Sequence, residues 1–462
     1  MPDTNNPYGT RIALDNGLRE DIPSPGSTGL SQNEDKHPMK RAIPRHILTL
    51  LALTILLPHR LFAASLPLAD YLTEAIEHNE NIQAAKSRVQ GIRQKARQSS
   101  SLPDPRMGIE YYLEPVETRT GPQEAAVSLS QTLPWPGKLS LAEKVARQDA
   151  AMAEARLAAT RLLVASRVKQ SYVEYAFNTE NQTSFAESLE LLKYMENVAR
   201  TRYAAGTVDY ANVLKIQIEL ARAENRLQTS RDQTYSLMVN LNSLLGADND
   251  RARPVPPLPD IILTTAEEHL LELAREHNPK LLEARESITK AQLGVDLAQK
   301  DFYPDLTLSV KTIFTGNAEF GNPPDSGKDP IIAGISFNIP LFQDRRHAAV
   351  EEKEAMAGAE RTSLNQEVRS LEADIQQGLF RYRNATRSRS LYNDTLLPTI
   401  HQQVEVALEA FQNGRLSVQE LLDAENNLLQ FQLARSRALA DQAIEVAKLE
   451  ELVGATLADW QN

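Results

Sequence analysis

Cysteine is absent from all 462 residues of the chain, which excludes disulfide bonds, thiolate metal sites and a lipid-modified cysteine. Basic residues are also outnumbered by acidic ones. The chain has 50 basic and 61 acidic residues, a formal net charge of -11, and no basic stripe that would indicate a nucleic-acid partner. It has no nucleotide-binding loop, zinc-protease motif or plausible catalytic triad. We therefore predict a protein that is not an enzyme and that binds no cofactor, resident metal or nucleic acid.

Long apolar runs are missing as well. The apolar run over residues 47–57 has about 11 residues, whereas a transmembrane helix needs about 20. It follows the basic stretch Met39-Lys40-Arg41 and precedes small residues at 63–65, a pattern typical of a signal peptide over residues 39–64. An N-terminal anchor or a buried helix is the alternative. Residues 1–38 are polar, and we expect them to be disordered or to be an upstream extension from a misassigned start codon.

Glycine and proline are rare in six long stretches of the remaining chain, which are rich in strong helix formers. The longest stretch that lacks both has roughly 67 residues and would form a rod of about 100 Å at 1.5 Å per residue. A globular core cannot bury such a rod, so it must pack against other long helices. The predicted helices cover residues 68–100, 138–204, 209–245, 267–300, 343–412 and 417–452.

Two of these helices end in similar tips. Tyr203-Ala204-Ala205-Gly206 and Phe411-Gln412-Asn413-Gly414 each place glycine three positions after an aromatic residue, and glycine just past a helical run marks a helix end. Ser417 is followed three residues later by Glu420, a capping-box pattern that begins the returning helix. Each tip therefore joins two helices of an antiparallel hairpin.

Four shorter segments change from helical to two-residue periodicity. In the first, Met107, Ile109 and Tyr111 point one way and the residues between them point the other way. The fold class is therefore mainly α with a small β part. The predicted strands cover residues 106–114, 125–133, 305–314 and 331–339.

Several patterns occur twice in the same order, which is evidence for an internal duplication. We predict a first repeat over residues 66–246, a proline-rich linker over 247–264 and a second repeat over 265–455. His78 and His277 recur at equivalent positions, which favours a polar position set by the fold over a metal site. Besides the tips, the recurring pairs are Glu77-His78-Asn79 with Glu276-His277-Asn278, Pro103-Asp104 with Pro304-Asp305, Leu133-Pro134 with Ile339-Pro340, and Leu245-Gly246 with Val453-Gly454.

The predicted strands have about the length of a tilted transmembrane strand, and each has one apolar and one polar face. Four strands cannot close a barrel, and an open edge in lipid leaves backbone groups without partners, so the chain must oligomerise. Two copies would give eight strands and a filled interior, whereas three would give twelve strands and a pore. A pair of soluble β-ribbons packed on a core is the alternative.

These features together resemble the TolC family of outer-membrane efflux proteins. The resemblance covers nearly all of residues 66–455 and rests on the two tips, on the run Glu420-Leu421-Leu422-Asp423-Ala424 and on Pro398. The corner Pro134-Trp135-Pro136-Gly137, where a strand meets a helix, resembles the heavy-metal efflux (CzcC/CusC-like) branch. The resemblance implies a homotrimer in the bacterial outer membrane, with a twelve-stranded β-barrel and a periplasmic tunnel of long antiparallel helices.

The resemblance also implies the function of an exit duct in a tripartite efflux system, passively exporting substrates, with heavy-metal cations as a candidate. The partners would be a periplasmic adaptor, an inner-membrane pump of the RND class and outer-membrane lipid. It places Glu420 and Asp423 at the periplasmic entrance gate, with a capping role and a solvated helix face as the alternatives. The tips at Gly206, Thr207, Gly414 and Arg415 would contact the adaptor, although the glycines also serve the turns.

Three other functions remain open. Exit ducts for type I protein secretion and for multidrug efflux share the same architecture, and metal as the cargo rests on the corner at 134–137 alone. A periplasmic coiled-coil scaffold without a pore is the alternative outside transport, and the alternating strands disfavour it.

Overall fold

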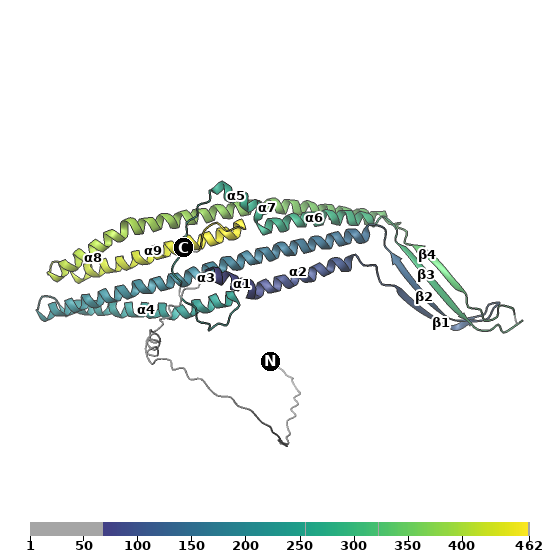
Figure 1. Ribbon diagram of the computed structural model, residues 1–462, viewed down its shortest axis with the longest axis horizontal. Coiled ribbons are helices and arrows are strands. Elements are labelled where there is room, and N and C mark those ends of the chain that lie inside the picture. Colours follow the sequence, from purple (N-terminus) through teal and green to yellow (C-terminus); the bar gives the residue numbers. More distant parts are fainter. Residues whose placement is uncertain (1–67, 255, 322, 461–462) are drawn as a thin grey trace, which may run out of the picture. The chain divides into compact units, whose positions relative to one another are not determined.

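The computed structural model describes residues 68–254, 256–321 and 323–460, coloured by sequence in Figure 1. The predicted signal peptide over residues 39–64 and the predicted extension over 1–38 lie outside the described residues. In the described part of the chain, no helix combines the length and the apolar character needed to cross a membrane.

Long helices make up most of the described chain. Helix α3 is continuous over 67 residues, as the sequence predicts, and it packs against α2 and α4 of its own half and against α6 and α9 of the other half. Helix α7 packs against α6 and α9, and α8 packs against α9 (Figure 1). The helices are α1 (Leu68–His78), α2 (Glu80–Ser99), α3 (Lys138–Ala204), α4 (Tyr210–Leu245), α5 (Glu267–His277), α6 (Pro279–Lys300), α7 (Gln343–Ser390), α8 (Leu397–Gln412) and α9 (Val418–Val453).

Two predicted helices, over residues 68–100 and 267–300, are wrong as continuous elements, because an asparagine interrupts each one. Asn79 and Asn278 have extended backbones with ψ of 122° and 119°, and each side chain accepts hydrogen bonds from two N–H groups of the helix that follows. Each asparagine is therefore an N-cap, a position that this residue type favours. Its amide also donates across to the end of a long helix, from Asn79 to Leu244 O at 2.8 Å and from Asn278 to Leu452 O at 2.7 Å.

These contacts explain why the Glu-His-Asn pattern and the helix-ending glycine both occur in each half of the sequence. Gly246 ends α4 beside His78, and Gly454 ends α9 beside His277, so the patterns that recur in the sequence meet in space in both halves. We call each meeting point a joint: Asn79 with Gly246, and Asn278 with Gly454.

The prediction of a helix over residues 343–412 is confirmed over its whole length, but the helix is not α-helical throughout. A π-helical turn, η1 (Leu391–Leu396), separates α7 from α8, and Pro398 stands in the first turn of α8. Proline has no N–H, so it cannot bond to the carbonyl group four residues earlier, and its ring needs extra room there. The wider turn just before it provides that room.

The four strands form one antiparallel sheet in the order β1-β2-β3-β4, so the strands of the two halves join through β2 and β3. Their bounds are β1 (Arg106–Val116), β2 (Gln123–Leu133), β3 (Leu306–Thr315) and β4 (Ile331–Phe337). Each strand end lies within two residues of its predicted position. Within the described chain, β1 pairs only with β2 and β4 pairs only with β3, so both outer strands have a free edge.

A buried apolar cluster holds the two hairpins together near their tips. It draws residues from α3, α4, α8 and α9, including the fully buried Leu192, Met195, Ile216 and Leu421. Burying a side chain of this size stabilises the fold by about 1.5–3 kcal/mol. The two tips are therefore parts of one packed region.

Candidate functional site

One face of the sheet is apolar and exposed, and we call it the outer face. Ile109 on β1, Val310 on β3 and Ile335 on β4 are 73%, 53% and 67% exposed. Cross-strand partners in an antiparallel sheet share a face, so the register places Ile109 with Val127 and Val310 with Leu129. Within the regularly paired parts of the four strands, no charged residue lies on this face. Such a face suits lipid or an apolar partner, not water.

The opposite, inner face carries mostly small polar side chains, with Ala126, Ile313 and Ile332 as its apolar exceptions. Its partners include Gly108 with Ser128, Ser130 with Ser309 and Thr132 with Thr307, whose hydroxyl oxygens lie 3.1 Å apart. Gln131, a polar side chain on the outer face, donates to the backbone oxygens of Pro103 and Thr132 at the end of the sheet near the helices. The two faces therefore differ as those of a membrane barrel strand do.

The predicted corner at Pro134, Trp135, Pro136 and Gly137 is tied to the second half of the chain. Asp305 accepts from the Trp135 backbone N–H at 2.8 Å and from Lys138 Nζ at 3.0 Å. The Trp135 ring stacks on Tyr303 with centroids 5.1 Å apart.

Gly137 begins α3 with a φ of 94°, a backbone conformation that other residues adopt only under strain. The corner thus fixes the direction in which α3 leaves the sheet. The sequence analysis did not identify Asp305 as the bridging residue, although it had noted the recurring Pro-Asp pair that contains it.

Both tips close with the same backbone hydrogen bonds. Thr207 N bonds to Arg202 O and Gly206 N to Tyr203 O, and Arg415 N bonds to Ala410 O and Gly414 N to Phe411 O. This is the Schellman pattern, which needs a left-handed residue, and the φ values of Gly206 and Gly414 are 73° and 76°. The glycines that the sequence singles out therefore serve the turns.

Arg202, which the sequence analysis missed, connects the two tips. Its Nη1 donates to Phe411 O at 2.5 Å, and its guanidinium lies over the Phe411 ring at 5.0 Å. A cavity of about 320 Å³ opens beside this contact, and we call it the tip groove. Of the four predicted tip residues, Gly206 and Thr207 line it, and Gly414 and Arg415 are not among its lining residues. The groove is lined by Arg202, Gly206, Thr207, Val208, Asp209, Asn212, Phe411, Leu416, Ser417 and Val418.

Glu420 and Asp423 lie on one exposed face of the first turns of α9. The capping box predicted from the sequence is present: the Glu420 N–H donates to Ser417 Oγ, and the Glu420 carboxylate accepts from the Ser417 N–H at 3.0 Å and from its hydroxyl at 2.7 Å. These bonds from Ser417 lower the pKa of the Glu420 carboxyl below its ordinary value of 4.5. Among the described residues, the Asp423 carboxylate accepts one hydrogen bond, from Gln419 at 2.9 Å, so it is the less engaged of the two carboxylates.

A third acidic residue near the tips, unlike Glu420 and Asp423, is buried. Glu425 on α9 is 2% exposed and accepts a hydrogen bond from Ser188 of α3. Burial raises the pKa of this carboxyl, although Arg226 of α4 acts against the rise. The Nε and Nη2 atoms of Arg226 are themselves buried without a partner among the described residues. The sequence pattern could have indicated Glu425, because it lies one helical turn after Leu421 on the apolar side of α9.

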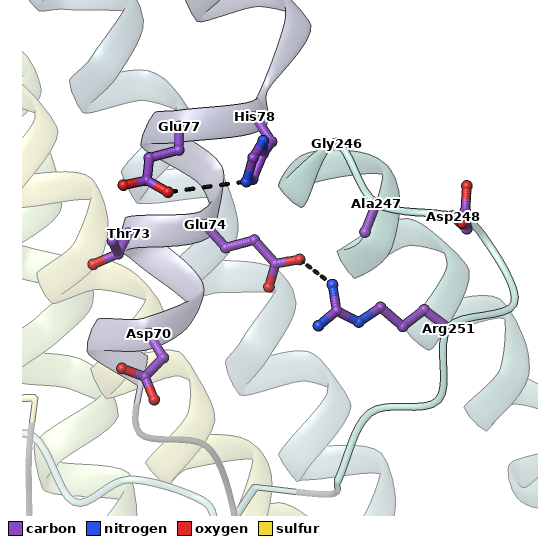
Figure 2. A pocket seen from close by; sticks show the side chains of 9 residues that line it. All are labelled: Asp70, Thr73, Glu74, Glu77, His78, Gly246, Ala247, Asp248 and Arg251. Carbon is purple, nitrogen blue, oxygen red and sulfur yellow. Dashed lines mark hydrogen bonds and ion pairs between the residues drawn. The ribbon is translucent and has the colours of Figure 1, made fainter. Parts of the chain in front are cut away.

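A polar cavity of about 550 Å³ lies at the first joint (Figure 2). Figure 2 shows Glu74 pointing toward Arg251, and the Glu74 carboxylate also accepts two bonds from Arg253 at 2.8 and 2.9 Å. The bond from Arg253 is the main cause that lowers the pKa of Glu74. The central charge of this cavity is therefore already neutralised by the chain itself. Within the described ranges, no cluster of three or more His, Cys, Asp or Glu side chains could hold a metal ion.

Known proteins share this architecture. The solved outer membrane protein VceC from Vibrio cholerae superimposes with a TM-score of 0.70 and 22% identity, over 84% of this chain and 96% of VceC. The cobalt-zinc-cadmium resistance protein CzcC of Cupriavidus metallidurans is 21% identical over 85% of this chain and 91% of its own length. The protein named "Probable outer membrane lipoprotein SilC" of Salmonella typhimurium is 24% identical over 77% of this chain and 78% of its own length.

The family described as "Outer membrane efflux protein" matches residues 71–247 and 270–455, most of the chain and one segment in each half. The predicted resemblance is therefore confirmed at the level of the family. This chain belongs to the outer membrane efflux protein family, and the outer membrane is its location.

Proposed function

We propose that this protein is the exit duct of a tripartite efflux system, working as a homotrimer with a periplasmic adaptor and an inner-membrane RND pump. The duct is passive in this proposal, and the inner-membrane pump drives transport. The two halves would be copies of one ancestral unit, a proposal supported by the matching joints and tips.

The observation that carries this proposal is the open sheet with its apolar outer face. A free edge in lipid leaves N–H and C=O groups unpaired, each costing several kcal/mol, so β1 and β4 need partners from other copies. Two copies would give eight strands with an interior filled by side chains, whereas three give twelve strands and room for a lumen lined by the inner face. Transport through the sheet therefore requires three copies.

The outer helices support the same assembly. In the tip-proximal half, α3 and α9 lie between α4 and α8, and both flanking elements expose apolar side chains. Leu214, Ile218 and Tyr235 are exposed on α4, and Phe380, Leu391 and Val406 are exposed along α7, η1 and α8. A ring of three copies would bury these edges against each other, with α4 of one copy next to α8 of the following one. The result would be a helical tunnel continuous with the barrel.

The tips would form the periplasmic entrance and the adaptor contact. Asp423 and Glu420 face solvent close to the tip, and threefold symmetry would bring three copies of each around one axis. Carboxylates gathered in this way favour cations and disfavour anions. The tip groove, together with Gly414 and Arg415 beside it, is the surface offered to the adaptor, whose contacting segment would need polar groups to match the groove.

Heavy-metal cations are the cargo that we favour. The names of the relatives support this choice, since CzcC is described as a cobalt-zinc-cadmium resistance protein. The second candidate is a duct for multidrug efflux or for type I protein secretion, since such a duct would share the same architecture.

The assembly is tested by outer-membrane fractionation followed by electrophoresis with and without heating. We expect a heat-modifiable trimer in the outer-membrane fraction. A monomer in the periplasmic fraction would contradict the duct and favour a coiled-coil scaffold without a pore. The cargo is tested by the growth of a deletion strain on silver, copper, zinc, cobalt, cadmium, dyes, bile salts and antibiotics, with complementation. Sensitivity confined to metals supports metal efflux, and sensitivity confined to drugs and detergents contradicts it.

The gate is tested with Asp423→Asn, Glu420→Gln and the double variant in planar bilayers. Removal of the carboxylates should raise the cation conductance or abolish block by divalent cations, with the larger effect at Asp423 because Glu420 is engaged by Ser417. Unchanged conductance and block in the double variant would contradict the assignment of the gate.

A further inference from the structure

The inner face of the sheet carries one ion pair in the middle of the strands. Lys311 Nζ on β3 lies 2.7 Å from Glu110 Oε2 on β1, although β2 separates the two strands. Within the regularly paired segments of the described sheet, the charged residues on the inner face are Arg106, Glu110 and Lys311. Arg106 belongs to the first pair of β1, at its end near the helices, so Glu110 and Lys311 are the charges at mid-strand.

Small residues in between make this long contact possible. Lys311 shares a row of cross-strand partners with Ser128 and Gly108, and the distance across two strand spacings is about 9.6 Å. A Cβ atom added to Gly108 would lie 2.7 Å from Ser128 Oγ, so the Ser128 hydroxyl already occupies the space above Gly108. The Lys311 side chain therefore extends over Ser128, which is too short to block it, and reaches Glu110 in the next row of this face.

Stability does not account for this pair. The side chains of Lys311 and Glu110 are 30% and 54% exposed, and an exposed ion pair contributes only about 0–1 kcal/mol. The strands are held in any case by their backbone hydrogen bonds. The consequence of the pair is electrostatic: each charge is cancelled at the wall, and the loss of either partner leaves a net charge on the inner face.

We propose that Glu110 and Lys311 are specificity-determining residues of the duct, which keep the barrel lumen close to neutral by cancelling each other at mid-depth. This inference rests on the proposed trimeric duct, in which the inner face lines the lumen. Threefold symmetry then places three such pairs at one depth. The pair then adds no net charge at this depth, so this level of the lumen admits both cations and anions.

The test is the ratio of cation to anion permeability, from reversal potentials of the full-length protein in planar bilayers under a KCl gradient. All variants carry Glu420→Gln and Asp423→Asn, so that the entrance carboxylates do not mask the barrel. Glu110→Gln should free three lysines and shift the ratio toward chloride, by about twofold or more. Lys311→Gln should free three carboxylates and shift the ratio toward potassium by a similar factor.

Two matched controls separate the pair from the single charges. The double variant Glu110→Gln with Lys311→Gln, and the exchanged pair Glu110→Lys with Lys311→Glu, should both return to the ratio of the parent protein. If both single variants conduct but keep the parent ratio, the inference about the pair is wrong and the duct stands. If the parent protein and the unaltered chain form no conducting channel, the duct itself is wrong and the inference falls with it.

Discussion

The two halves of the molecule share a backbone plan but differ in the side chains placed on it. Each half breaks a short helix at an asparagine, packs that break against a glycine at the end of a long helix, and closes a hairpin with the same turn. Gly206 and Gly414 even share their φ value to within a few degrees. The backbone geometry at these places is therefore a requirement of the fold.

The side chains at matching places follow no such rule. Counting from the tip glycines, Asn212 and Gln217 of α4 stand where α9 has Glu420 and Glu425. Asp209 begins α4 without a side-chain cap, whereas Ser417 begins α9 with a complete capping box. At these two matching positions only the second hairpin carries a carboxylate. The shared backbone plan therefore does not fix the charge of the side chains placed on it.

The largest effect should come from the shared joints. A Cβ at Gly246 would lie 2.4 Å from His78 O, and one at Gly454 would lie 2.6 Å from His277 O, at φ values of 69° and 82°. Left-handed strain and overpacking together predict that Gly246→Ala and Gly454→Ala each cost about 2–5 kcal/mol of stability. Thermal unfolding followed by circular dichroism measures this cost.

Two other glycines provide the controls. Gly91 in α2 and Gly294 in α6 have open space where a Cβ would go, so Gly91→Ala and Gly294→Ala should leave stability unchanged or raise it slightly. Equal losses at the two joints would show that both halves depend on the same contact. Melting at the wild-type temperature in either joint variant would contradict the packing described here.

The next largest effect concerns the pH dependence of stability caused by the buried Glu425 carboxyl, which occurs in the second hairpin and has no counterpart at the matching position of the first. Because burial raises the pKa of Glu425, the neutral carboxyl stabilises the fold fully below its unfolded pKa of about 4.5, and this stability is lost as the pH rises through the folded value. Glu425→Gln gives the second hairpin the residue type of the first and removes the titration. We expect its melting temperature to exceed that of the wild type by a few degrees at neutral pH and to converge with it below about pH 4.5.

An exposed glutamate of α8 serves as the comparison for this measurement. Glu405→Gln makes the same substitution at a residue that lies in solvent, so it controls for the loss of one carboxylate as such. A wild-type pH profile in Glu425→Gln would mean that the charge of Glu425 is fully compensated by Arg226, which faces it from α4 together with Glu219.

A smaller effect concerns the tip glycines. Gly206→Ala should cost about 1–2 kcal/mol, from left-handed strain alone, since open space surrounds it. A Cβ at Gly414 would also lie 3.1 Å from Arg202 Nη2, so Gly414→Ala should cost up to about 1 kcal/mol more as the bond from Arg202 to Phe411 O weakens. Hydrogen exchange of the tip amides measures both. In an Arg202→Ala background the extra cost should vanish, and its persistence would show that Arg202 is not the link.

The smallest expected effect is the pH dependence of the capping box that Ser417 and Glu420 form at the start of α9. The pKa of Glu420 is lowered by the bonds from Ser417, so the ionised carboxylate stabilises the start of α9 above the unfolded pKa, and this contribution disappears as the pH falls through the lowered value. Glu420→Gln should therefore exchange its first-turn amides faster than the wild type at pH 7 and at the same rate near pH 3. Asp209→Asn should show no such difference, because Asp209 makes no side-chain cap bond. A similar pH dependence at both tips would remove the contrast between them.

Much of the architecture could be predicted because it depends on local rules. The ends of α3, the positive-φ glycines of the tips, the capping box at Ser417 and the alternation in all four strands follow from residue types within a few positions of each other. The interruption at Asn79 obeys a local rule too, since asparagine favours N-caps, but the surrounding helix formers masked it. The π-turn before Pro398 was hidden in the same way by the strong helical pattern on both sides.

The functional details could not be predicted, because they join residues far apart in the chain. Arg202 meets Phe411, Ser188 meets Glu425, and Lys311 meets Glu110. Phe411 and Glu425 carry local signals in the sequence, but no local pattern links them to Arg202 and Ser188. Their partners depend on which helices pack together and on which strands pair, and a register shift of one residue would have placed Lys311 on the outer face.

The long hairpins, the strands and the family could be predicted from residue patterns, because helix periodicity, turn glycines and strand alternation are encoded within a few residues. The way in which the halves meet depends on tertiary contacts: through β2 and β3 in the sheet, through Asp305 at the corner and through Arg202 at the tips. The physical reason is that burial and pairing act between surfaces. The energy of a buried carboxyl or of a crossed ion pair depends on the neighbours that folding brings to it.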